Sequence, residues 1–333
     1  MCSARYYTSS RHGGAKQLKP PRTYIELDPT TPFIRPCGAR KLSTSNNSGQ
    51  EENTDGTIRD LPVNAFSPED SRWTTEYDKP SLPVPDIEIV SWNVDFMAVD
   101  AADRVFCILD HLKTVILTND SQPAMILLQE LKEESFKTVL ANRWVREHFV
   151  IVPPNTGYWP GRYGLATLVS RHIRIEKAQM LQFRQTTMGR TAIFVDVSLR
   201  TADANAKGGE KSASIRIANT HLDMLRQPGI DAGIVGGDMN MILPADQRIH
   251  VAAGLHDAGT DGPEANTWGY QSKRRSYQAK RMDRVFYTPA PGLVVEPVEV
   301  VGKGLKTERG QWVSDHYALQ TTIALRHEED SDS

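Results

Sequence analysis

The chain has 333 residues, of which 39% are apolar, and its 41 acidic and 39 basic side chains leave a formal net charge of −2. This apolar content is sufficient for a substantial core, in one large or two ordinary domains. The near-neutral charge excludes a global positive field, so any attraction to nucleic acid must come from a local patch.

The composition changes abruptly near residue 85. Residues 1–84 are rich in Ser, Thr, Pro, Gly and Asn and have almost no periodic apolar pattern. Such a segment cannot bury enough surface to offset its ordering entropy. We therefore predict that residues 1–84 are mostly disordered, that residues 85–327 form the folded domain, and that residues 328–333 are an acidic tail.

The first residues also bear on the cellular compartment. They are basic, with no acid before Glu26, which is typical of a mitochondrial transit peptide or of a basic nuclear tail. Because the amphipathic helix of a transit peptide is not evident, the sequence favours the nucleus or cytoplasm over the mitochondrion. Three widely spaced cysteines argue against a disulfide framework and against a zinc site, and favour a reducing, intracellular compartment. No apolar run approaches the length of about 18 residues that a membrane span needs.

Strand and helix patterns then alternate along the chain. The apolar run at 87–90 predicts a strand, and apolar residues at helical spacing over 105–116 predict an amphipathic helix. A second strand follows at 125–128, and a second helix has its apolar face over 136–144. Further strands are predicted at 164–170, 191–199, 215–223, 234–235, 282–287 and 317–325, with a solvated hairpin loop at 205–209.

Polar side chains end five of these apolar runs. Because the carboxyl ends of distant strands in a parallel or mixed sheet meet at one edge, these side chains can converge without being neighbours in sequence. We interpret them as one hydrolytic site. The groups are Asn93, Glu130, His221, Asp238 with Asn240, and Asp315 with His316.

Glu130 follows four apolar residues at a strand end, where an ionised carboxylate is tolerated near water or a cation. Mg²⁺ suits this position because it prefers oxygen ligands and takes one or two protein carboxylates together with waters and substrate phosphate. The amide of Asn93 could orient Glu130 or the hydration water of the ion. In isolation, Glu130 equally suits the start of a helix in a β-α turn, and Asn93 suits an Asx turn.

Asp238 and Asn240 follow two glycines that allow the backbone to approach a ligand closely. If the segment stays extended, both side chains point to the same side. Asp238 can then hold or deprotonate a water, while Asn240 donates to a non-bridging phosphate oxygen. The simpler interpretation of this motif is a Gly-Asp turn between strands.

His316 titrates near neutrality, and the adjacent Asp315 cannot readily bond to its own neighbour, so each side chain has a separate partner in the site. His316 would stabilise the pentavalent phosphate or protonate the leaving oxygen, and Asp315 would orient a second histidine or bind metal. His221 is the natural second histidine, although a half-buried structural histidine fits its strand equally well.

Six motifs, in this order, resemble those of the endonuclease/exonuclease/phosphatase superfamily over residues 87 to about 325. They are Ser91-Trp92-Asn93, Leu128-Gln129-Glu130, Thr220-His221-Leu222, Gly237-Asp238-Met239-Asn240, Arg281-Met282-Asp283-Arg284-Val285 and Ser314-Asp315-His316. One motif would be a weak signal, but six in the correct order are specific. The resemblance implies a four-layered α/β sandwich of two packed mixed sheets flanked by helices, and Mg²⁺- or Mn²⁺-dependent cleavage of a phosphoester.

The resemblance also implies a role for each matching position. The implied roles are metal ligand for Glu130 with Asn93 beside it, activation of the nucleophilic water for Asp238, phosphate contact for Asn240 and His221, transition-state stabilisation for His316, and completion of the cluster for Asp315.

Within the superfamily, the chain is most similar to the type-2 tyrosyl-DNA phosphodiesterases. The similarity lies in Leu128-Gln129-Glu130, Met188-Gly189-Arg190 and Arg281-x-Asp283-Arg284. This branch implies a nucleic acid or a DNA-linked adduct as substrate, and a role in DNA repair. The chain departs from the branch after Asn240, where Met241-Ile242-Leu243 stands in place of Leu-Arg-Asp.

A second departure is a short connection between two predicted strands. Only residues 223–233 separate Thr220-His221-Leu222 from the strand at Ile234, where family members usually have a helix. If the strands are parallel neighbours, the crossover needs about a dozen residues or more. We therefore hypothesise that the chain is less stable or less active than a version with the helix restored.

Basic and aromatic side chains are interleaved between Trp268 and Tyr287, which suits a nucleic-acid backbone and a splayed base. We predict that Arg190, Trp268 and Arg281 bind the substrate. Charge runs on loops are nevertheless usually solvated, and Trp268 also suits a core position. The alternatives to a nuclease or phosphodiesterase are a phosphatase or phospholipase-type enzyme acting on a small phosphoester, and a catalytically impaired binding protein of the same fold. Since no coiled-coil heptads occur, we expect a monomer.

Overall fold

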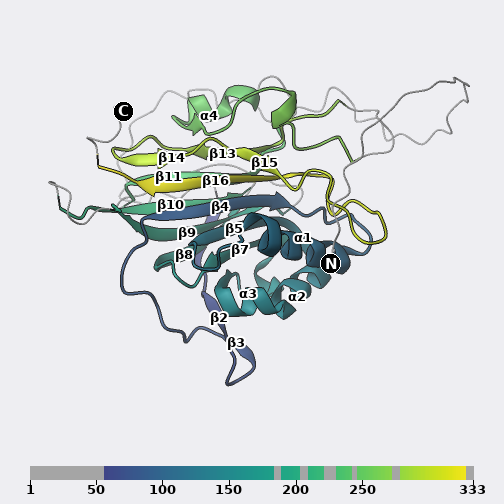
Figure 1. Cartoon of the computed structure of the whole chain (residues 1–333), viewed down its shortest axis with the longest axis horizontal. Coiled ribbons are helices and arrows are strands. Elements are labelled where there is room, and N and C mark those ends of the chain that lie inside the picture. Colours follow the sequence, from purple (N-terminus) through teal and green to yellow (C-terminus); the bar gives the residue numbers. More distant parts are fainter. Residues whose placement is uncertain are drawn as a thin grey trace, which may run out of the picture. The chain divides into compact units, whose positions relative to one another are not determined.

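The strands of the protein form two mixed β-sheets (Figure 1). The computed structural model describes residues 56–183, 189–202, 209–220, 230–241, 246–271 and 278–327, which fall in one compact unit. The first sheet has the strand order β1-β8-β9-β10-β11-β13-β12. The second has the order β14-β16-β4-β5-β7-β6-β2-β3, with β15 also paired to β16.

The bounds of the elements show how far each strand and helix runs. The first sheet contains β1 Gly56–Asp60, β8 Ile175–Phe183, β9 Thr191–Arg200, β10 Ser212–Thr220, β11 Ala232–Asp238, β12 His256–Asp257 and β13 Asp283–Tyr287. The second contains β2 Asn64–Ser67, β3 Arg72–Thr74, β4 Asp86–Asn93, β5 Ala124–Lys132, β6 Phe149–Val152, β7 Tyr163–Ser170, β14 Leu293–Val295, β15 Glu299–Val301 and β16 Ala318–Leu325. The helices are α1 Ala101–His111, a π-helix Leu112–Ile116, α2 Glu133–Ala141, α3 Arg143–His148, α4 Ile249–Ala252 and the 3-10 turns Thr156–Tyr158, Asp246–Arg248 and Pro263–Ala265.

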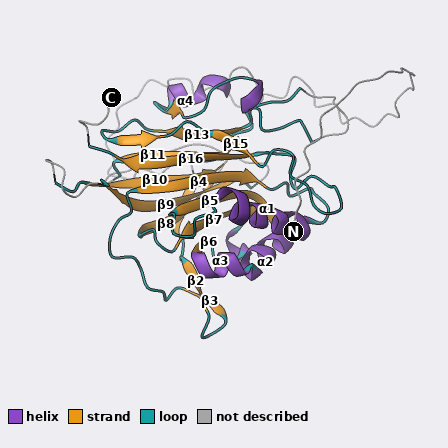
Figure 2. Cartoon of the chain, in the orientation of Figure 1, coloured by secondary structure: helices purple, strands orange, loops and turns teal. Residues whose placement is uncertain are grey.

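Three apolar layers explain why the two sheets pack. The central layer lies between the sheets and includes Ile89 and Leu127 of the second sheet and Val195 and Ile217 of the first. A second layer joins the other face of the second sheet to α1, α2 and α3, which lie together in Figure 2. A third layer covers the outer face of the first sheet, where Phe286 is buried and its ring stacks on His250 of α4 with centroids 4.7 Å apart. The predicted α/β sandwich of two mixed sheets flanked by helices is confirmed.

The helix predicted over 136–144 is two helices in the structure, α2 and α3. They are separated at Asn142, whose backbone is extended and whose side chain accepts a hydrogen bond from the amide of Val145 at 3.2 Å. An asparagine side chain in this position caps a helix start, so it ends α2 and begins α3. None of the helices within the described ranges is both long and apolar enough to cross a bilayer.

The sheets include residues that lie before the predicted boundary at residue 85. Strand β1 pairs antiparallel with β8, while β2 pairs with both β3 and β6. Leu61 and Ala65 are buried in the central layer. The sequence signal is weak because these strands are only three to five residues long and lie at or next to the edge of their sheets, where few positions need apolar side chains. The expectations for residues 1–55 and 328–333 concern parts of the chain outside the described residues.

Strands β10 and β11 are parallel neighbours, with Asn219 paired to Gly236. Their connection is therefore a crossover of residues 221–231, of which 221–229 lie outside the described residues. Close packing at the end of β11 requires a glycine, because Gly237 has φ 156° and a Cβ atom there would collide with the carbonyl oxygen of Thr220. The two strands are thus parallel, as the sequence argument assumed, and the connection between them is short for a parallel crossover.

Candidate active site

Glu130 lies where β5 leaves the second sheet. Strands β4 and β5 are parallel, and Asn93 at the end of β4 is paired with Gln129. The pairing of β5 with β7 shifts between Leu128 and Leu131, which is a bulge, and Glu130 itself has the left-handed φ of 61°. Its Oε2 accepts a hydrogen bond from the amide of Phe96 at 3.2 Å. A bulge and a left-handed non-glycine residue re-aim a side chain at backbone cost, as is common at functional sites.

Asn93 and Asp238 join the two sheets at this edge. Asn93 Nδ2 donates to Asp238 Oδ2 at 3.1 Å, and both side chains are buried. Asp238 Oδ1 accepts from the backbone amide of Asn240 at 2.9 Å, which holds the turn that follows β11. Asn240 has φ 47°, so it is a further left-handed residue of the site. The structure therefore brings together the side chains of Asn93 and Asp238 and the backbone of Asn240, which the sequence assigns to one site.

His316 lies between two carboxylates. Its Nδ1 is 2.7 Å from Asp283 Oδ2, and its Nε2 is 3.7 Å from Asp238 Oδ2. Asp283 was not among the predicted catalytic residues, although it lies in the motif Arg281–Val285 that carries part of the resemblance. Its place in the site follows from the strand pairing, because Asp283 lies directly opposite Asp238 in the antiparallel pair β11 and β13.

The charge of His316 follows from these neighbours. Burial alone lowers the pKa of His316, but Asp283, Asp238 and Asp315 outweigh burial and raise the pKa to about 10. Burial also raises the pKa of Asp283, while the imidazolium opposes this change. Because the two groups are in direct hydrogen-bond contact, we assign them as an imidazolium and carboxylate pair at neutral pH. His316 is then a buried cation that can stabilise negative charge on a phosphate.

Asp315 and Trp268 form the more exposed side of the site. Trp268 Nε1 donates to Asp315 Oδ2 at 3.0 Å, and Asp315 Oδ1 is 3.8 Å from His316 Nε2. The side chain of Asp315 is 47% exposed, in contrast to 5% for His316. Trp268 therefore orients a carboxylate that can face an incoming substrate. His221, the second predicted histidine, lies outside the described residues.

The backbone around His316 is held by the end of β4. Ser314 Oγ donates to the carbonyl of Asn93 at 2.6 Å and accepts from the amide of His316 at 3.0 Å. Trp92 Nε1 donates to the carbonyl of His316 at 3.2 Å. The motifs around Asn93 and His316 are thus in direct contact, although more than two hundred residues separate them in the chain.

Of the predicted substrate-binding residues, Arg190 lies near the phenol of Tyr163. Burial and the charge of Glu130 raise the pKa of Tyr163, while Arg190 lowers it, so the phenol is close to both charges. The ring of Tyr163 stacks on Phe96 with centroids 4.1 Å apart. Arg190 and Glu130 thus act on the same phenol, and the predicted role of Arg190 in substrate binding stays a prediction.

Arg281 has a different environment. Its guanidinium donates to both oxygens of Asp257 at 2.5 and 2.8 Å, and its side chain is only 6% exposed. Arg284 shares the same carboxylate at 2.8 Å. The charge of these two arginines is thus balanced inside the protein by Asp257 and, on the surface, by Asp261. The predicted role of Arg281 in substrate binding stays a prediction that these contacts do not favour.

The carboxylates of the site suit a divalent cation. Burial and the nearby Asp315 raise the pKa of Asp95, whose amide hydrogen-bonds to Asn93 Oδ1 at 3.0 Å. Asp238, Asp283 and Asp315 lie within 4 Å of His316 and outnumber its single positive charge. Carboxylate and amide oxygens are the ligands that Mg²⁺ prefers.

Two positions for a cation can be compared. Ligand atoms of Asp238, Asp283 and His316 lie within 4.8 Å of one another among the described residues. These three side chains are almost completely buried, and the imidazole is already hydrogen-bonded to Asp283. Mg²⁺ keeps several waters, so the partly exposed Glu130 beside Asn93 fits a hydrated ion better.

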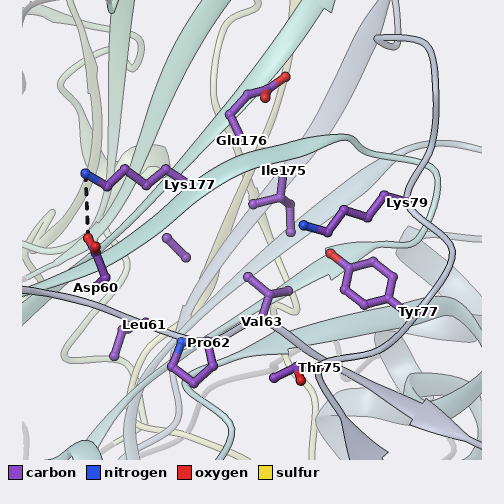
Figure 3. Close-up of a pocket in the computed structure, with 11 residues that line it drawn as sticks. Asp60, Leu61, Pro62, Val63, Thr75, Tyr77, Lys79, Ile175, Glu176 and Lys177 are labelled. Carbon is purple, nitrogen blue, oxygen red and sulfur yellow. Dashed lines mark ion pairs between the residues drawn. The ribbon is translucent and has the colours of Figure 1, made fainter.

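A separate pocket of about 310 Å³ lies between β1, β8 and residues 75–79 (Figure 3). It is formed by the first residues of β8, whereas the site lies at the other end of this sheet, beside Thr220. Within the pocket, Lys177 Nζ is 3.6 Å from Asp60 Oδ1, and Figure 3 shows this ion pair at one side. The pocket is therefore not part of the candidate active site.

The packed sheets and the edge where acid, amide and imidazole groups meet define a hydrolase-like α/β sandwich. The sequence model of the endonuclease/exonuclease/phosphatase family matches residues 90–316, and the chain belongs to this family. Its members are hydrolases that act on phosphoesters, which supports a phosphoesterase or nuclease type of function. A search of curated proteins finds no match.

Solved structures show the same fold. The chain is similar to TDP2 from Caenorhabditis elegans, with 21% identity and a TM-score of 0.54 over 72% of this chain and 75% of that one. It is also similar to D. rerio TDP2 complexed with a single strand DNA product, with 19% identity and a TM-score of 0.53 over 72% of this chain and 98% of that one. The predicted resemblance to the superfamily is confirmed by the family match.

Proposed function

We propose that the protein is a Mg²⁺- or Mn²⁺-dependent phosphodiesterase that acts on nucleic acid or on a DNA-linked adduct. The observation that carries this proposal is the continuous arrangement of Asp283, His316, Asp238 and Asn93, with 2.7, 3.7 and 3.1 Å between consecutive partners. It sets a buried cation beside a buried carboxylate at one edge of the sandwich.

Each side chain has a role that follows from its contacts. Asp238 accepts a hydrogen bond from the Asn93 amide and lies 3.7 Å from His316 Nε2, and it can hold a water and accept its proton. His316, kept protonated by Asp283, donates to the phosphoryl oxygen as negative charge develops there. Asn240 lies two residues from Asp238 and can donate to a non-bridging oxygen. The resemblance assigns His221 to the same phosphate.

Glu130 and Asn93 are the residues that would hold the cation. When bound, a divalent ion acts as a Lewis acid on the phosphoryl group and offsets the charge of the leaving oxygen. The protein contributes a carboxylate that is fixed by the amide of Phe96 and by the strained backbone of Glu130 itself. This preorganisation means that little rearrangement is needed when the ion binds.

The preference for a nucleic-acid substrate is supported by a related structure and by the surface near the site. D. rerio TDP2 has been solved with a single strand DNA product. In the present chain, Met97 and Val99 lie two and four residues after Asp95 and are 77% and 66% exposed, so exposed apolar side chains lie close to this acidic group in the chain. Such side chains can pack against a base or an aromatic leaving group.

A substrate panel tests the proposal. Hydrolysis of single-stranded DNA, RNA, a 5′-tyrosyl DNA oligonucleotide, a phosphomonoester and a phospholipid would be measured with Mg²⁺, with Mn²⁺ and with a chelator. We expect cleavage of a nucleic-acid phosphodiester that the chelator abolishes. Preferential cleavage of the phosphomonoester or the phospholipid would instead support the small-phosphoester alternative.

A catalytically impaired binding protein is the second candidate function. The observation that favours it is the parallel pairing of β10 and β11 across the short connection of residues 221–231. Shifting β11 by about 1 Å relative to the second sheet would be costly, because catalysis depends steeply on position. Metal-independent binding of the nucleic acid without any turnover would support this candidate over the enzyme.

A further inference from the structure

A buried network of charges lies behind the active site, around Asp257. Its carboxylate accepts hydrogen bonds from Arg281 at 2.5 and 2.8 Å and from Arg284 at 2.8 Å. The side chains of Arg284, Arg281 and Asp257 are 3%, 6% and 13% exposed. Asp257 belongs to β12, which pairs only with β13 among the described strands, so this network ties the edge strand to its neighbour.

The network reaches the active site through β13. Arg281 and Arg284 lie on either side of Asp283 in sequence, and both are bonded to the same carboxylate. Asp283 and Arg284 are consecutive in a strand, so their side chains point to opposite faces of the sheet. Asp257 therefore holds β13 on the outer face of the first sheet, through Arg284. On the opposite face of the same strand, Asp283 contacts His316.

A second arm of the network reaches the turn after β11. Arg284 Nη2 donates to Gln247 Oε1 at 2.8 Å, and Gln247 Nε2 donates to the carbonyl of Met241 at 2.8 Å. Met241 directly follows Asn240, the left-handed residue whose amide bonds to Asp238. A left-handed asparagine persists only where the surrounding contacts hold it, and Gln247 supplies one of these contacts.

The local sequence leaves room for this network. Gly259 donates its amide to Asp257 Oδ1 at 2.9 Å, and a Cβ atom at this glycine would collide with the guanidinium of Arg281. Although burial raises the pKa of Asp257, the hydrogen bonds and charges of the two arginines lower it overall, so the carboxylate is ionised. Gly259 leaves space for the guanidinium of Arg281, and the negative charge of Asp257 allows Arg281 and Arg284 to share it as a partner.

We propose that Asp257, Arg284 and Gln247 are positioning residues, which hold Asp283 and Asn240 in register around His316 and Asp238. This inference rests on the proposed phosphodiesterase function and deepens it. The network does not touch the reacting groups, and it acts through the two segments that carry them. Partners of this kind behind a catalytic group commonly contribute about 10- to 100-fold to activity.

The test compares two buried ion pairs in the same sheet. Asp196 holds Arg216 with two hydrogen bonds of 2.7 Å, and their side chains are 7% and 2% exposed. Arg216 also donates to Gln179 on β8 at 3.3 Å and lies over the ring of Phe194 on β9. Asp196→Asn is thus a matched control for Asp257→Asn, because it removes an equally buried charge from a pair that is not bonded to β13.

The kinetic measurement uses the full chain with Mg²⁺ and bis-p-nitrophenyl phosphate. We expect kcat to fall about 10- to 100-fold in Asp257→Asn, with KM within about twofold, and much less in Asp196→Asn at a similar loss of melting temperature. Equal effects of the two variants on kcat would reduce Asp257 to a structural residue and overturn the proposal.

Gln247 provides a second test that does not depend on a buried charge, because its side chain is exposed. Gln247→Glu keeps an acceptor for Arg284 but cannot donate to the carbonyl of Met241, whereas Gln247→Leu loses both bonds. We expect both variants to keep the wild-type melting temperature and to lower kcat about 3- to 10-fold. Wild-type kcat in both would remove Gln247 from the proposal.

Amide hydrogen exchange separates this inference from the function on which it rests. Exchange in peptides covering 238–241 and 281–287 should become faster in Asp257→Asn and stay unchanged in Asp196→Asn. This readout needs no turnover, so an inactive wild-type chain would count against the phosphodiesterase and not against the network. Unchanged exchange in both segments of Asp257→Asn would contradict the positioning role directly.

Discussion

His316 carries a positive charge in a place that is almost closed to solvent, and this charge depends on Asp283. Because the pKa of His316 is higher in the folded than in the unfolded protein, the free energy of unfolding depends on pH in a defined direction. The free energy of unfolding includes the full contribution of the pair below the ordinary imidazole pKa, and this contribution is lost as the pH rises through about 10. Activity that requires the imidazolium should therefore be constant near neutral pH and decline toward pH 10.

Replacing Asp283 by Asn tests this assignment. The change removes the largest favourable interaction of the imidazolium, so the pKa of His316 should fall toward its ordinary value. We expect the alkaline limb of the kcat profile to move to lower pH, and kcat at pH 8 to fall about 10- to 100-fold. A profile from pH 5 to 10.5 measures both effects. An unshifted alkaline limb would show that His316 does not act as the cation of the site.

Glu130 tests the position of the metal. Glu130→Gln keeps the acceptor for the Phe96 amide but lowers the charge available to a cation. We expect kcat/KM to fall more than about 100-fold, with a higher Mg²⁺ concentration needed for half-maximal rate and little change in melting temperature. The exposed Glu134 of α2 provides the matched control, Glu134→Gln. Wild-type Mg²⁺ dependence in Glu130→Gln would favour a site at Asp238 and Asp283 instead.

At the scale of elements, strand ends explain what the sequence could predict. Asn93, Glu130 and Asp238 each follow an apolar run, so their place at one sheet edge could be inferred from strand direction alone. Asp283 begins its strand, and its place depends on the antiparallel pairing of β13 with β11, which the sequence does not reveal. Arg281 looked available for a substrate because its partner, Asp257, lies on a strand of two residues that carries no periodic signal.

The crossover between β10 and β11 gives a prediction at the same scale. Inserting an amphipathic helix of about 12 residues at the 221–231 connection would give the outer apolar layer, which includes Phe194, Val235 and Phe286, further cover. We expect a higher melting temperature, by about 2 to 4 °C for each kcal/mol gained, and a higher kcat. Thermal unfolding and turnover of the two versions provide the comparison. Identical values would mean that the short connection is sufficient.

For the molecule as a whole, the site exists only while both sheets stay packed. Asn93 of the second sheet donates a hydrogen bond to Asp238 of the first. Gln129 of the second sheet likewise donates to Asn219 of the first at 3.0 Å. The side-chain amides of Asn93 and Asn219 donate hydrogen bonds across the interface, so loss of sheet packing leaves these donors unsatisfied. Stability of the sandwich and geometry of the site are therefore linked.

The amino-terminal strands test how far this linkage extends. A chain that starts at residue 85 lacks β1, β2 and β3, including the buried Leu61 and the bond from Trp73 Nε1 to the carbonyl of Leu140 at 3.3 Å. Each large apolar side chain that is lost contributes about 1.5 to 3 kcal/mol. We expect this chain to melt more than about 5 °C below one that starts at residue 56, and to lose activity in parallel. Equal melting temperatures would instead support the predicted domain boundary at residue 85, because β8 would then be stable as the edge of its sheet without β1.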